Sequence, residues 1–329
     1  MLEPVWEREG DAPPDLSVIM PVRNTAALVG EAVSSVLDQR GCAAEIVISD
    51  DHSDDGTLDA VLRVVRGDRG PHTVRVVRPV RRLAIDHVDA LARAATCRLL
   101  VQAHGDDVSL PDRLTTLLDV HRTTGAALVT SAATLLTASG IADEPVPFIA
   151  ESGWLPLETV IRTNPGGALA GARYALDRSV FERFPPLTSA YLPIGHDVLQ
   201  AFRAALLGGV WLCAAPLIRW RQHDGQWTHA LWDTRLPAAN DFGFLLNRLG
   251  AMRAMGKDLD HAAATGLLPD DRVAAVRAVV NTAASRAFND LLRLREDLRR
   301  LGREPLWVTV EEMARANTTG SVTGAGGTE

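Results

Sequence analysis

The stretch that decides the fold class is Val101–Leu114, which reads VQAHGDDVSLPDRL. It begins as the end of an apolar run typical of a buried strand, and a histidine, a glycine and two adjacent carboxylates, Asp106 and Asp107, follow. Ser109 and Pro111 then predict the start of a helix, because a hydroxyl cap and a proline in the first turn are typical there. The two carboxylates would therefore lie on a loop at the carboxyl end of a strand, where open α/β sheets bind ligands.

A second acidic pair, Asp50 and Asp51, follows the apolar residues 44–49. If both strands belong to one parallel sheet, the two pairs face a single crevice. Paired carboxylates favour a hard divalent cation, and such a cation commonly holds phosphate oxygens. A solvated, helix-capping turn would explain one such pair, but two pairs at equivalent strand ends predict a shared ligand site.

The chain on either side of these pairs alternates between strand and helix patterns, which predicts an α/β fold with a mostly parallel sheet flanked by helices. The predicted strands cover residues 16–20, 44–49, 73–77, 98–103 and 126–131, and the predicted helices cover residues 26–39, 58–66, 86–95 and 111–123. Beyond residue 132 we expect a helix over 176–184, a helix over 196–207, a strand over 210–214 and an extended stretch over 216–220. Strand signals then fade, and helices are expected over 242–255 and 270–301.

Composition limits the class of protein. A length of 329 residues allows one large domain plus an appendage, and a formal net charge of −7 argues against a nucleic-acid partner. The three scattered cysteines, Cys42, Cys97 and Cys213, fit reduced thiols. The sequence has neither an apolar run of membrane-spanning length nor a signal-peptide pattern at its start, so we expect a cytoplasmic protein and leave open a peripheral contact with a membrane.

Five segments together resemble the family 2 glycosyltransferases of GT-A fold. They are PVRN (Pro21–Asn24), EIVISDDHSDDGT (Glu45–Thr57), GDD with a downstream proline and arginine (Gly105–Arg113), GHD opening a helix that ends in two glycines (Gly195–Asp197), and PLIRWRQH (Pro216–His223). The resemblance implies a GT-A catalytic domain over residues 1–225, with a nucleotide half over roughly 15–131 and an acceptor half over roughly 132–225. A helical region over 226–317 and a disordered tail over 318–329 would follow.

The resemblance assigns the donor nucleotide to the first half. Pro21, Val22 and Asn24 would form one wall of the nucleobase site, and Asp50 would accept a hydrogen bond from the base. Asp51 would lie near the base and the ribose. The implied donor is a UDP-, dTDP- or GDP-sugar.

The same resemblance implies a reaction centre. Asp106 would be the metal-binding acid that holds Mg²⁺ or Mn²⁺ against the donor diphosphate, and Asp197 would be the general base for an acceptor hydroxyl. His223 and Arg221 would approach the diphosphate, and His223 would also reach the metal. His104 stands where the family usually has an acid, and it could bond the ribose or reach the metal as a softer ligand that favours Mn²⁺. The implied reaction is a metal-dependent transfer that inverts the anomeric centre in a single displacement.

Two other functions stay open. A non-catalytic subunit that binds a sugar nucleotide is suggested by His104 and by His196, which replaces an acid that often precedes the base. A nucleotidyltransferase would also be α/β with metal-binding acids, but it needs a Gly-rich basic loop after the first strand, where residues 21–30 contain only Arg23. The mixed charges along 270–301 predict a solvated helix face or a seam between copies of the chain.

Overall fold

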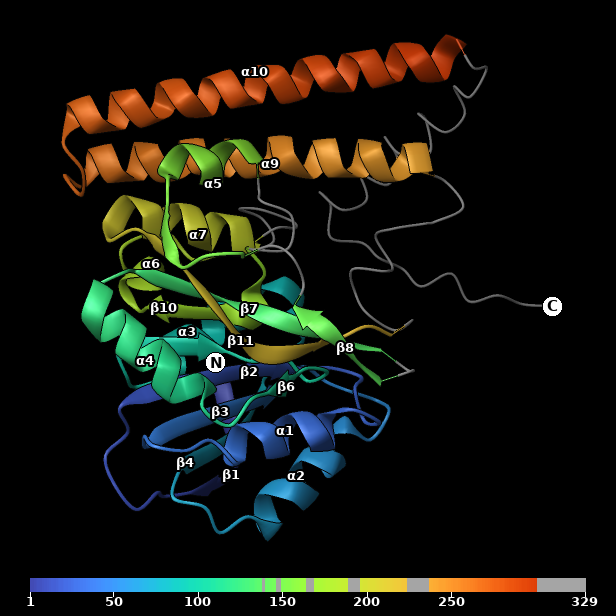
Figure 1. Ribbon diagram of the computed structural model, residues 1–329, viewed down its shortest axis with the longest axis vertical. Coiled ribbons are helices and arrows are strands. Elements are labelled where there is room, and N and C mark those ends of the chain that lie inside the picture. The colour runs from blue at the N-terminus through green and yellow to red at the C-terminus, as the bar shows by residue number, and fades with distance from the viewer. Residues whose placement is uncertain (138–139, 146–148, 164–168, 189–195, 224–236, 301–329) are drawn as a thin grey trace. The chain divides into compact units, whose positions relative to one another are not determined.

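The computed structural model describes residues 1–137, 140–145, 149–163, 169–188, 196–223 and 237–300 (Figure 1). The chain forms two compact units, one of Met1–Leu187 with Asp197–His223 and the other of Thr188–His196 with Asp224–Glu329. The sheet and both acidic pairs belong to the first unit. Gly195 of the GHD segment and the tail 318–329 lie outside the described residues.

Four parallel strands form the centre of the first unit. They are β2 (Leu16–Val22), β3 (Ala44–Asp50), β4 (Thr73–Pro79) and β5 (Leu99–Gln102), and they lie side by side in the order β4-β3-β2-β5. Val22 lies opposite Asp50, and Ile19 lies opposite Gln102. The carboxyl ends of β2, β3 and β5 therefore meet at one edge, which places the loops of both acidic pairs together as the sequence predicts.

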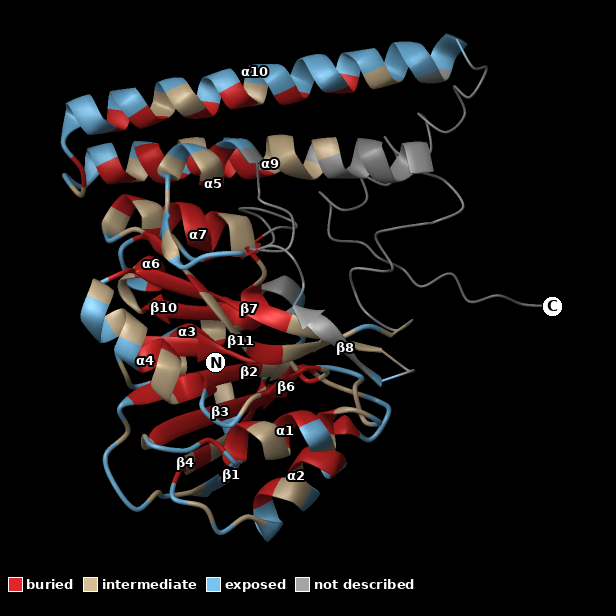
Figure 2. Cartoon of the chain, viewed as in Figure 1, coloured by how far each residue is buried: buried red, intermediate tan, exposed pale blue. Residues whose placement is uncertain are grey.

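Helices cover one face of these strands. Val18, Met20 and Ile46 belong to one continuous apolar core with the buried faces of α1 (Val29–Leu37), α2 (Thr57–Gly67) and α4 (Arg113–Thr124). Figure 2 shows β2 and β3 buried along nearly all of their length, whereas α4 is exposed on its outer side. The helix α3 (His87–Ala94) packs against β2 outside this cluster. The predicted α/β fold with a sheet flanked by helices is confirmed.

The sheet is mixed rather than mostly parallel. On one side, β1 (Leu2–Arg8) pairs with β4 in the antiparallel direction. On the other side, β10 (Tyr174–Asp177) runs antiparallel between β5 and β7 (Leu128–Thr137), and β11 (Val210–Arg221) lies parallel to β7. Short strands complete the sheet: β6 (Val108–Ser109) and β9 (Gly153–Leu155) pair with β11, and β8 (Gly140–Pro145) pairs with β7. Parallel pairing between neighbouring strands is thus concentrated in β2 to β5, where strands alternate with helices along the chain.

The predicted helix over 176–184 is wrong at its start. Tyr174–Asp177 is the central strand β10, and α6 (Ser179–Glu182) covers only one turn. Tyr174 and Leu176 are fully buried, so packing inside the sheet outweighs the local helix pattern. Asp177 still acts at the helix start, because its Oδ1 accepts the Ser179 N–H at 2.9 Å.

The predicted helix start after the acidic pair is also displaced. Ser109 is not a cap but a residue of β6, paired with Ile218 of β11. Its hydroxyl accepts a hydrogen bond from Arg113, the first residue of α4, at 2.9 Å. The strand predicted over 210–214 and the extended stretch over 216–220 form one continuous strand, β11, with irregular pairing between Cys213 and Ile218.

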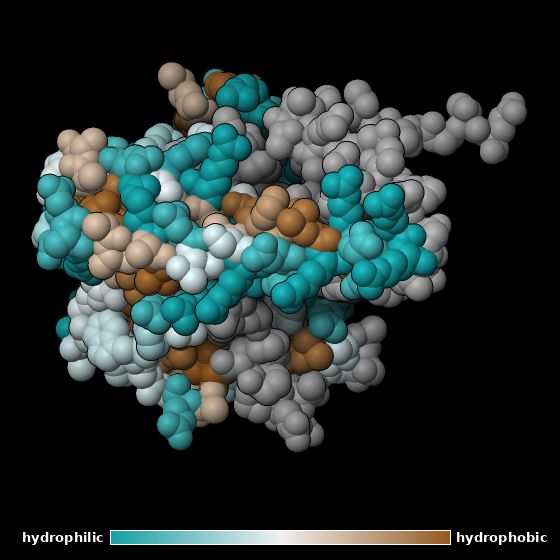
Figure 3. All heavy atoms as spheres, turned by 90° about the horizontal axis from the view of Figure 1, so that it is seen from above, coloured by the Kyte–Doolittle hydropathy of each residue, from teal (hydrophilic) through white to brown (hydrophobic). Residues whose placement is uncertain are grey.

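The second unit contains the two predicted C-terminal helices, α9 (Pro237–Ala264) and α10 (Asp270–Arg300), which pack against each other. Buried apolar residues repeat along α10, among them Val273, Val276, Val280, Ala283 and Ala287. Hydrophilic side chains gather over α10 on the face seen in Figure 3, and hydrophobic ones lie between them. The described residues include no helix that is long and apolar enough to cross a membrane.

The helix predicted over 196–207 is present as α7 (His196–Leu207), and three smaller elements remain. They are the 3-10 helices at Ala84–Asp86 and Gly171–Arg173 and the helix α5 (Leu157–Thr163). Both 3-10 helices lie beside candidate site residues, as the contacts below show.

Candidate functional site

The loops after β2 and β3 are bound to each other at the carboxyl edge of the sheet. The backbone N–H of Asn24 donates to Ser53 Oγ at 3.0 Å, and the side-chain oxygen of Asn24 accepts the Asp54 N–H at 3.1 Å. Asn24 and His52 both have left-handed backbone conformations, with φ of 49° and 57°. Asparagine tolerates this region better than most residues, so Asn24 suits a turn that also clamps the neighbouring loop.

Asp50, the last residue of β3, is buried and only partly satisfied. Its Oδ2 accepts the Ser53 N–H at 3.2 Å and lies 3.4 Å from Arg78 Nε in an ion pair. Its Oδ1 has no hydrogen-bond partner among the described residues. A buried acceptor without a donor costs free energy, so the oxygen is suited to a ligand that supplies an N–H.

Asp51 has a different environment from its neighbour. Its two carboxylate oxygens accept the backbone N–H groups of Leu83 and Ala84 at 2.7 and 2.8 Å. Ala84 has a left-handed φ of 50°, so Asp51 fixes a strained turn after β4. Next to this turn, burial lowers the pKa of His87, and the charges of Asp51 and Asp50 oppose that shift. The predicted contact of Asp51 with base and ribose stays a prediction.

The loop after β5 gathers three side chains that could hold a metal. One ligand atom from each of His104, Asp106 and Asp107 lies within 4.8 Å of the others. His223 Nε2 lies 3.1 Å from Asp106 Oδ2. Burial raises the pKa of Asp107 to about 6, and the charge of Asp106 adds to the rise. A group with this pKa is readily ionised when a cation binds beside it.

The end of β11 holds this acidic loop in place. The Arg221 backbone N–H donates to Asp107 Oδ1 at 2.9 Å, and Arg221 Nε donates to the backbone oxygen of Asp106 at 2.8 Å. Arg221 also pairs with the Glu31 carboxylate of α1. The structure therefore brings together Arg221, His223 and Asp106, which are far apart in sequence.

A buried arginine, Arg113, fixes the end of the strand that precedes the acidic loop. In the sequence analysis it is only one residue of the third segment of the resemblance and has no assigned role. Arg113 donates to the backbone oxygens of Gln102 and Ala172, each at 2.7 Å. Burial lowers the pKa of Arg113 to about 10, and the charge of Asp107 opposes the shift, so the guanidinium stays charged at neutral pH. Arg113 thus joins the end of β5 to the 3-10 helix at Gly171–Arg173. No periodicity in the sequence marks an arginine for such a place.

Asp197 lies in the first turn of α7 (His196–Leu207) and comes close to the same end of β5. A Cβ atom on Gly171 would lie 2.7 Å from Asp197 Oδ1 and 2.6 Å from Gln102 Oε1. The Gln102 amide in turn donates to Gln200 Oε1 at 2.9 Å. Gly105 similarly packs against Val22, whose Cγ1 would be 3.0 Å from an added Cβ. The predicted base, the nucleobase wall and the acidic loop therefore all adjoin the end of β5.

The residues of the acidic loop fit a divalent cation. Ligand atoms on opposite sides of an octahedral Mg²⁺ lie about 4.2 Å apart, so a cluster within 4.8 Å needs only a small adjustment. The mixed set of one imidazole and two carboxylates suits Mn²⁺ as well as Mg²⁺.

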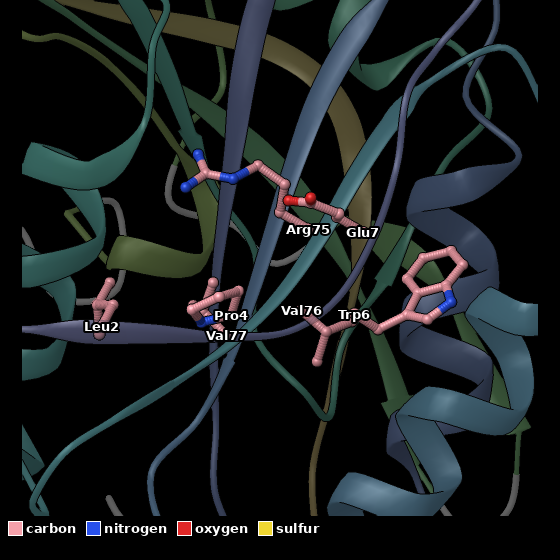
Figure 4. Close-up of a pocket in the computed structure, with 7 residues that line it drawn as sticks. All are labelled: Leu2, Pro4, Trp6, Glu7, Arg75, Val76 and Val77. Atoms are coloured by element: carbon pink, nitrogen blue, oxygen red, sulfur yellow. The ribbon is translucent and has the colours of Figure 1, made fainter.

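A separate hollow of about 200 Å³ lies over β1 and β4 (Figure 4). Its lining includes Leu2, Pro4, Trp6, Glu7, Arg75, Val76 and Val77. None of the predicted site residues lines it, and Arg75 is paired with Glu45 at 2.8 Å. The hollow is therefore separate from the candidate site at the strand edge with Asp50, Asp106 and Asp197.

The fold, with an acidic edge at the carboxyl ends of its parallel strands, is similar to that of known proteins. Residues 17–142 match the model of the glycosyl transferase family 2. This part of the chain is similar to the family 2 glycosyltransferases, and the fold is that of the GT-A glycosyltransferases.

The most similar solved structures include TarS 1–349 of S. aureus in complex with UDP-GlcNAc. It is 15% identical, with a TM-score of 0.56 over 87% of this chain and 92% of that chain. The same TarS segment in complex with UDP is 15% identical, with a TM-score of 0.51 over 87% and 91% of the two chains. At such identity the likeness shows the fold.

One sequence relative is an uncharacterised protein of Mycobacterium tuberculosis (strain CDC 1551 / Oshkosh), MT1568. It is 33% identical over 108 residues. The match spans 32% of this chain and 32% of that relative.

Proposed function

We propose that the protein is a metal-dependent, inverting glycosyltransferase that moves a sugar from a nucleotide-diphosphate donor to an acceptor hydroxyl. The observation that carries the proposal is the meeting of three unlike groups at one strand edge. Asp50 presents a buried oxygen without a partner, His104, Asp106 and Asp107 cluster within 4.8 Å, and Asp197 adjoins the end of β5. These groups suit a nucleobase, a metal-bound diphosphate and an acceptor hydroxyl, in that order.

Each group has a defined task in this proposal. Asp50 accepts an N–H of the base, with Asn24 and Val22 forming a wall beside it. His104, Asp106 and Asp107 would hold the cation, and a bound cation acts as a Lewis acid on the leaving diphosphate. Arg221 and His223, which contact the acidic loop, add positive charge where the diphosphate leaves.

Asp197 is proposed to accept the proton of the acceptor hydroxyl. The carboxylate lies in the first turn of α7, and its Oδ1 adjoins Gly171 beside the end of β5. An ionised carboxylate that faces the sugar opposite the leaving group activates the hydroxyl for a single displacement. One displacement inverts the anomeric configuration, and no covalent sugar–enzyme bond is needed.

A donor-turnover assay tests the proposal. We expect release of nucleoside diphosphate from a nucleotide sugar in the presence of Mn²⁺ and its loss with EDTA. Asp106→Asn should weaken metal-dependent donor binding, whereas Asp197→Asn should abolish turnover and leave donor binding intact. Equal effects of the two variants on donor binding would contradict this division of tasks.

A non-catalytic sugar-nucleotide-binding subunit is the second candidate function, and His104 in place of an acid favours it. That function predicts metal-dependent binding of the donor without turnover for any acceptor supplied. The location of His104 inside the ligand cluster argues for retained metal binding under either function.

A further inference from the structure

We infer that the exposed face of α10 binds a second copy of this chain in the antiparallel direction, which makes the protein a dimer held together by its C-terminal helices. The inference goes beyond the proposed function and does not depend on it. The mixed charges of this segment are compatible with a solvated helix face or with a seam between copies. The arrangement of exposed side chains along the helix favours the seam.

Two large apolar side chains of α10 lie on the surface. Phe288 is 51% exposed and Leu292 is 44% exposed, and one helical turn separates them. The buried residues of α10 lie on another side, where this helix packs against α9 (Figure 2). Because α9 leaves Phe288 and Leu292 uncovered, burying them against a further partner would gain the free energy of removing apolar surface from water.

These two residues belong to a longer row of exposed side chains on α10, which we call the outer stripe. It consists of two series of residues spaced seven apart, Ala274, Asn281, Phe288 and Arg295, and Ala278, Ser285, Leu292 and Arg299. The outer stripe lies about 120° around the helix from the buried row that begins at Val273 and Val276. Two positions in every seven is the repeat by which helices pair along a seam, so the outer stripe has the geometry of a second seam.

The charges at the two ends of α10 decide which partner fits this seam. The helix begins with Asp270 and Asp271 and ends with Arg299 and Arg300. A second copy that runs in the opposite direction brings its basic end to the acidic start of the first, and the two-fold symmetry repeats this contact at the other end. A parallel copy would place like charges together at both ends. The helix is therefore complementary to itself in the antiparallel direction.

The side-chain sizes along the outer stripe agree with the same direction. In an antiparallel helix pair, a residue of one series lies opposite a residue of the other series. With the two-fold axis between Ser285 and Phe288, Phe288 of each copy lies opposite Ser285 of the other, and Leu292 lies opposite Asn281. Each large side chain thus meets a smaller one, and both Phe288 rings lie at the centre of the interface, where binding energy is concentrated.

An anionic membrane fits the same face less well. Arg293 Nη1 lies 3.9 Å from Asp290 Oδ1, and Arg300 Nε lies 3.4 Å from Glu296 Oε1. Asp297 adds another exposed negative charge to this end of α10. The apolar patch therefore lies among charges of both signs, whereas anionic lipids attract a surface that is predominantly basic.

Sedimentation velocity of the full chain tests the inference. We expect the wild type to sediment as a dimer at low micromolar concentration. Phe288→Glu removes the central apolar contact and places two negative charges beside the two-fold axis, so it should raise the dimer dissociation constant at least about hundredfold. Because Phe288 is exposed in a single copy, the variant should keep the helical circular dichroism spectrum of the wild type.

Ala275→Glu is the matched control. It adds the same charge at an exposed position of α10 that lies outside the outer stripe. The dissociation constant of this variant should stay within about threefold of the wild-type value, as expected for a surface substitution away from the interface.

Cross-linking tests the direction of pairing. The antiparallel register brings residue 281 of one copy to residue 292 of the other, so the double variant with Asn281→Cys and Leu292→Cys should form a covalent dimer on oxidation. Neither single variant should do so, because the two copies of residue 281 would be about 16 Å apart along the helix axis, too far for a disulfide. The wild type, with Cys42, Cys97 and Cys213, is the control for cross-linking elsewhere.

Four results would overturn the inference. The first is a wild-type chain that stays monomeric at tens of micromolar, and the second is a dimer that Phe288→Glu leaves intact. The third is a covalent dimer of the Asn281→Cys single variant, which would indicate parallel pairing. The fourth is a monomer that binds phosphatidylglycerol vesicles and loses this binding through Phe288→Glu, because the occupant of the outer stripe would then be a membrane.

Discussion

The carboxylate of Asp197 lies directly against the backbone of Gly171, where a Cβ atom would be 2.7 Å from Asp197 Oδ1. The same Cβ would be 2.6 Å from Gln102 Oε1. Gly171 thus leaves room for two polar side chains that come from β5 and α7. This close approach brings the proposed base Asp197 of α7 next to Gln102, the last residue of β5, after which the acidic loop begins.

Gly171→Ala should therefore lower turnover without unfolding the protein. Both atoms that the new Cβ meets are at the ends of side chains, which can turn aside, so we expect a stability loss of about 1–2 kcal/mol. The displaced Asp197 carboxylate should lose its alignment with the acceptor, lowering kcat by about tenfold to a hundredfold. Donor affinity should stay unchanged because the acids after β5 keep their places.

Gly153→Ala provides the matched control. Gly153 lies in β9, and an added Cβ there would meet nothing within 4 Å. Turnover and thermal unfolding of this variant should match the wild type. Full turnover of Gly171→Ala would contradict the proposal that the rate depends on the exact position of the Asp197 carboxylate.

Asp51 is expected to be a stability residue. Its two oxygens accept the Leu83 and Ala84 N–H groups, and the carboxylate is buried. Asp51→Asn leaves one of these N–H groups facing an NH₂ group, which should cost about 2–3 kcal/mol in the free energy of unfolding. Urea unfolding measures the loss. The exposed Asp54→Asn is the control, and equal stability of the two variants would contradict the structural role.

The sequence was sufficient for the parallel centre of the sheet but not for its second half. Repeating apolar patterns mark β2, α1, β3 and α2 because each buries one defined face, and the acids after β3 and β5 stand out against them. The helix predicted over 176–184 overlaps the last two residues of β10, Leu176 and Asp177, because β10 pairs with β5 and β7, which come from distant parts of the chain.

The same difference separates the site residues that could be predicted from those that could not. Asp50 and Asp106 could be predicted as site residues because the apolar patterns in the sequence show where the strands end. Gly171 and Arg113 act through contacts with Asp197, Gln102 and Ala172, and no local spacing encodes those contacts.

His72 should make the fold less stable in mild acid. The side chain is buried, and its ring nitrogens contact the Ala44 N–H at 3.3 Å and the Gln39 backbone oxygen at 3.2 Å, an arrangement that requires the neutral ring. Burial lowers the pKa of His72 below its ordinary 6.5. Below pH 6.5 the unfolded chain therefore binds a proton that the folded chain does not, and stability falls with falling pH, by at most about 1.4 kcal/mol per pH unit for one histidine.

Urea unfolding at pH 7.5, 6.0 and 5.0 tests this dependence. His72→Asn keeps an acceptor for the Ala44 N–H but cannot be protonated, so its stability should fall less steeply between pH 6.5 and 5. The buried His87, whose pKa is also lowered by burial, contributes to the slope that remains. An identical slope in the variant and the wild type would remove His72 from the explanation.

His104 is expected to set which metal supports the reaction. Its imidazole lies within 4.8 Å of the Asp106 and Asp107 ligand atoms, and a nitrogen ligand favours Mn²⁺ relative to Mg²⁺. His104→Asp should lower the ratio of the Mn²⁺-supported to the Mg²⁺-supported rate. It should also destabilise the metal-free protein, because a third carboxylate would adjoin Asp107, whose pKa is already raised to about 6 by burial and by Asp106.

His104→Ala separates ligation from repulsion. If the imidazole is a ligand, the alanine variant should need a higher Mn²⁺ concentration for half-maximal turnover, by about tenfold, which is within the range for a metal-site substitution. Its metal-free stability should not fall as that of His104→Asp does, since no charge is added. If neither variant changes the metal concentration dependence or the Mn²⁺-to-Mg²⁺ ratio, then Asp106 and Asp107 hold the cation without His104, and the imidazole is free to contact the donor instead.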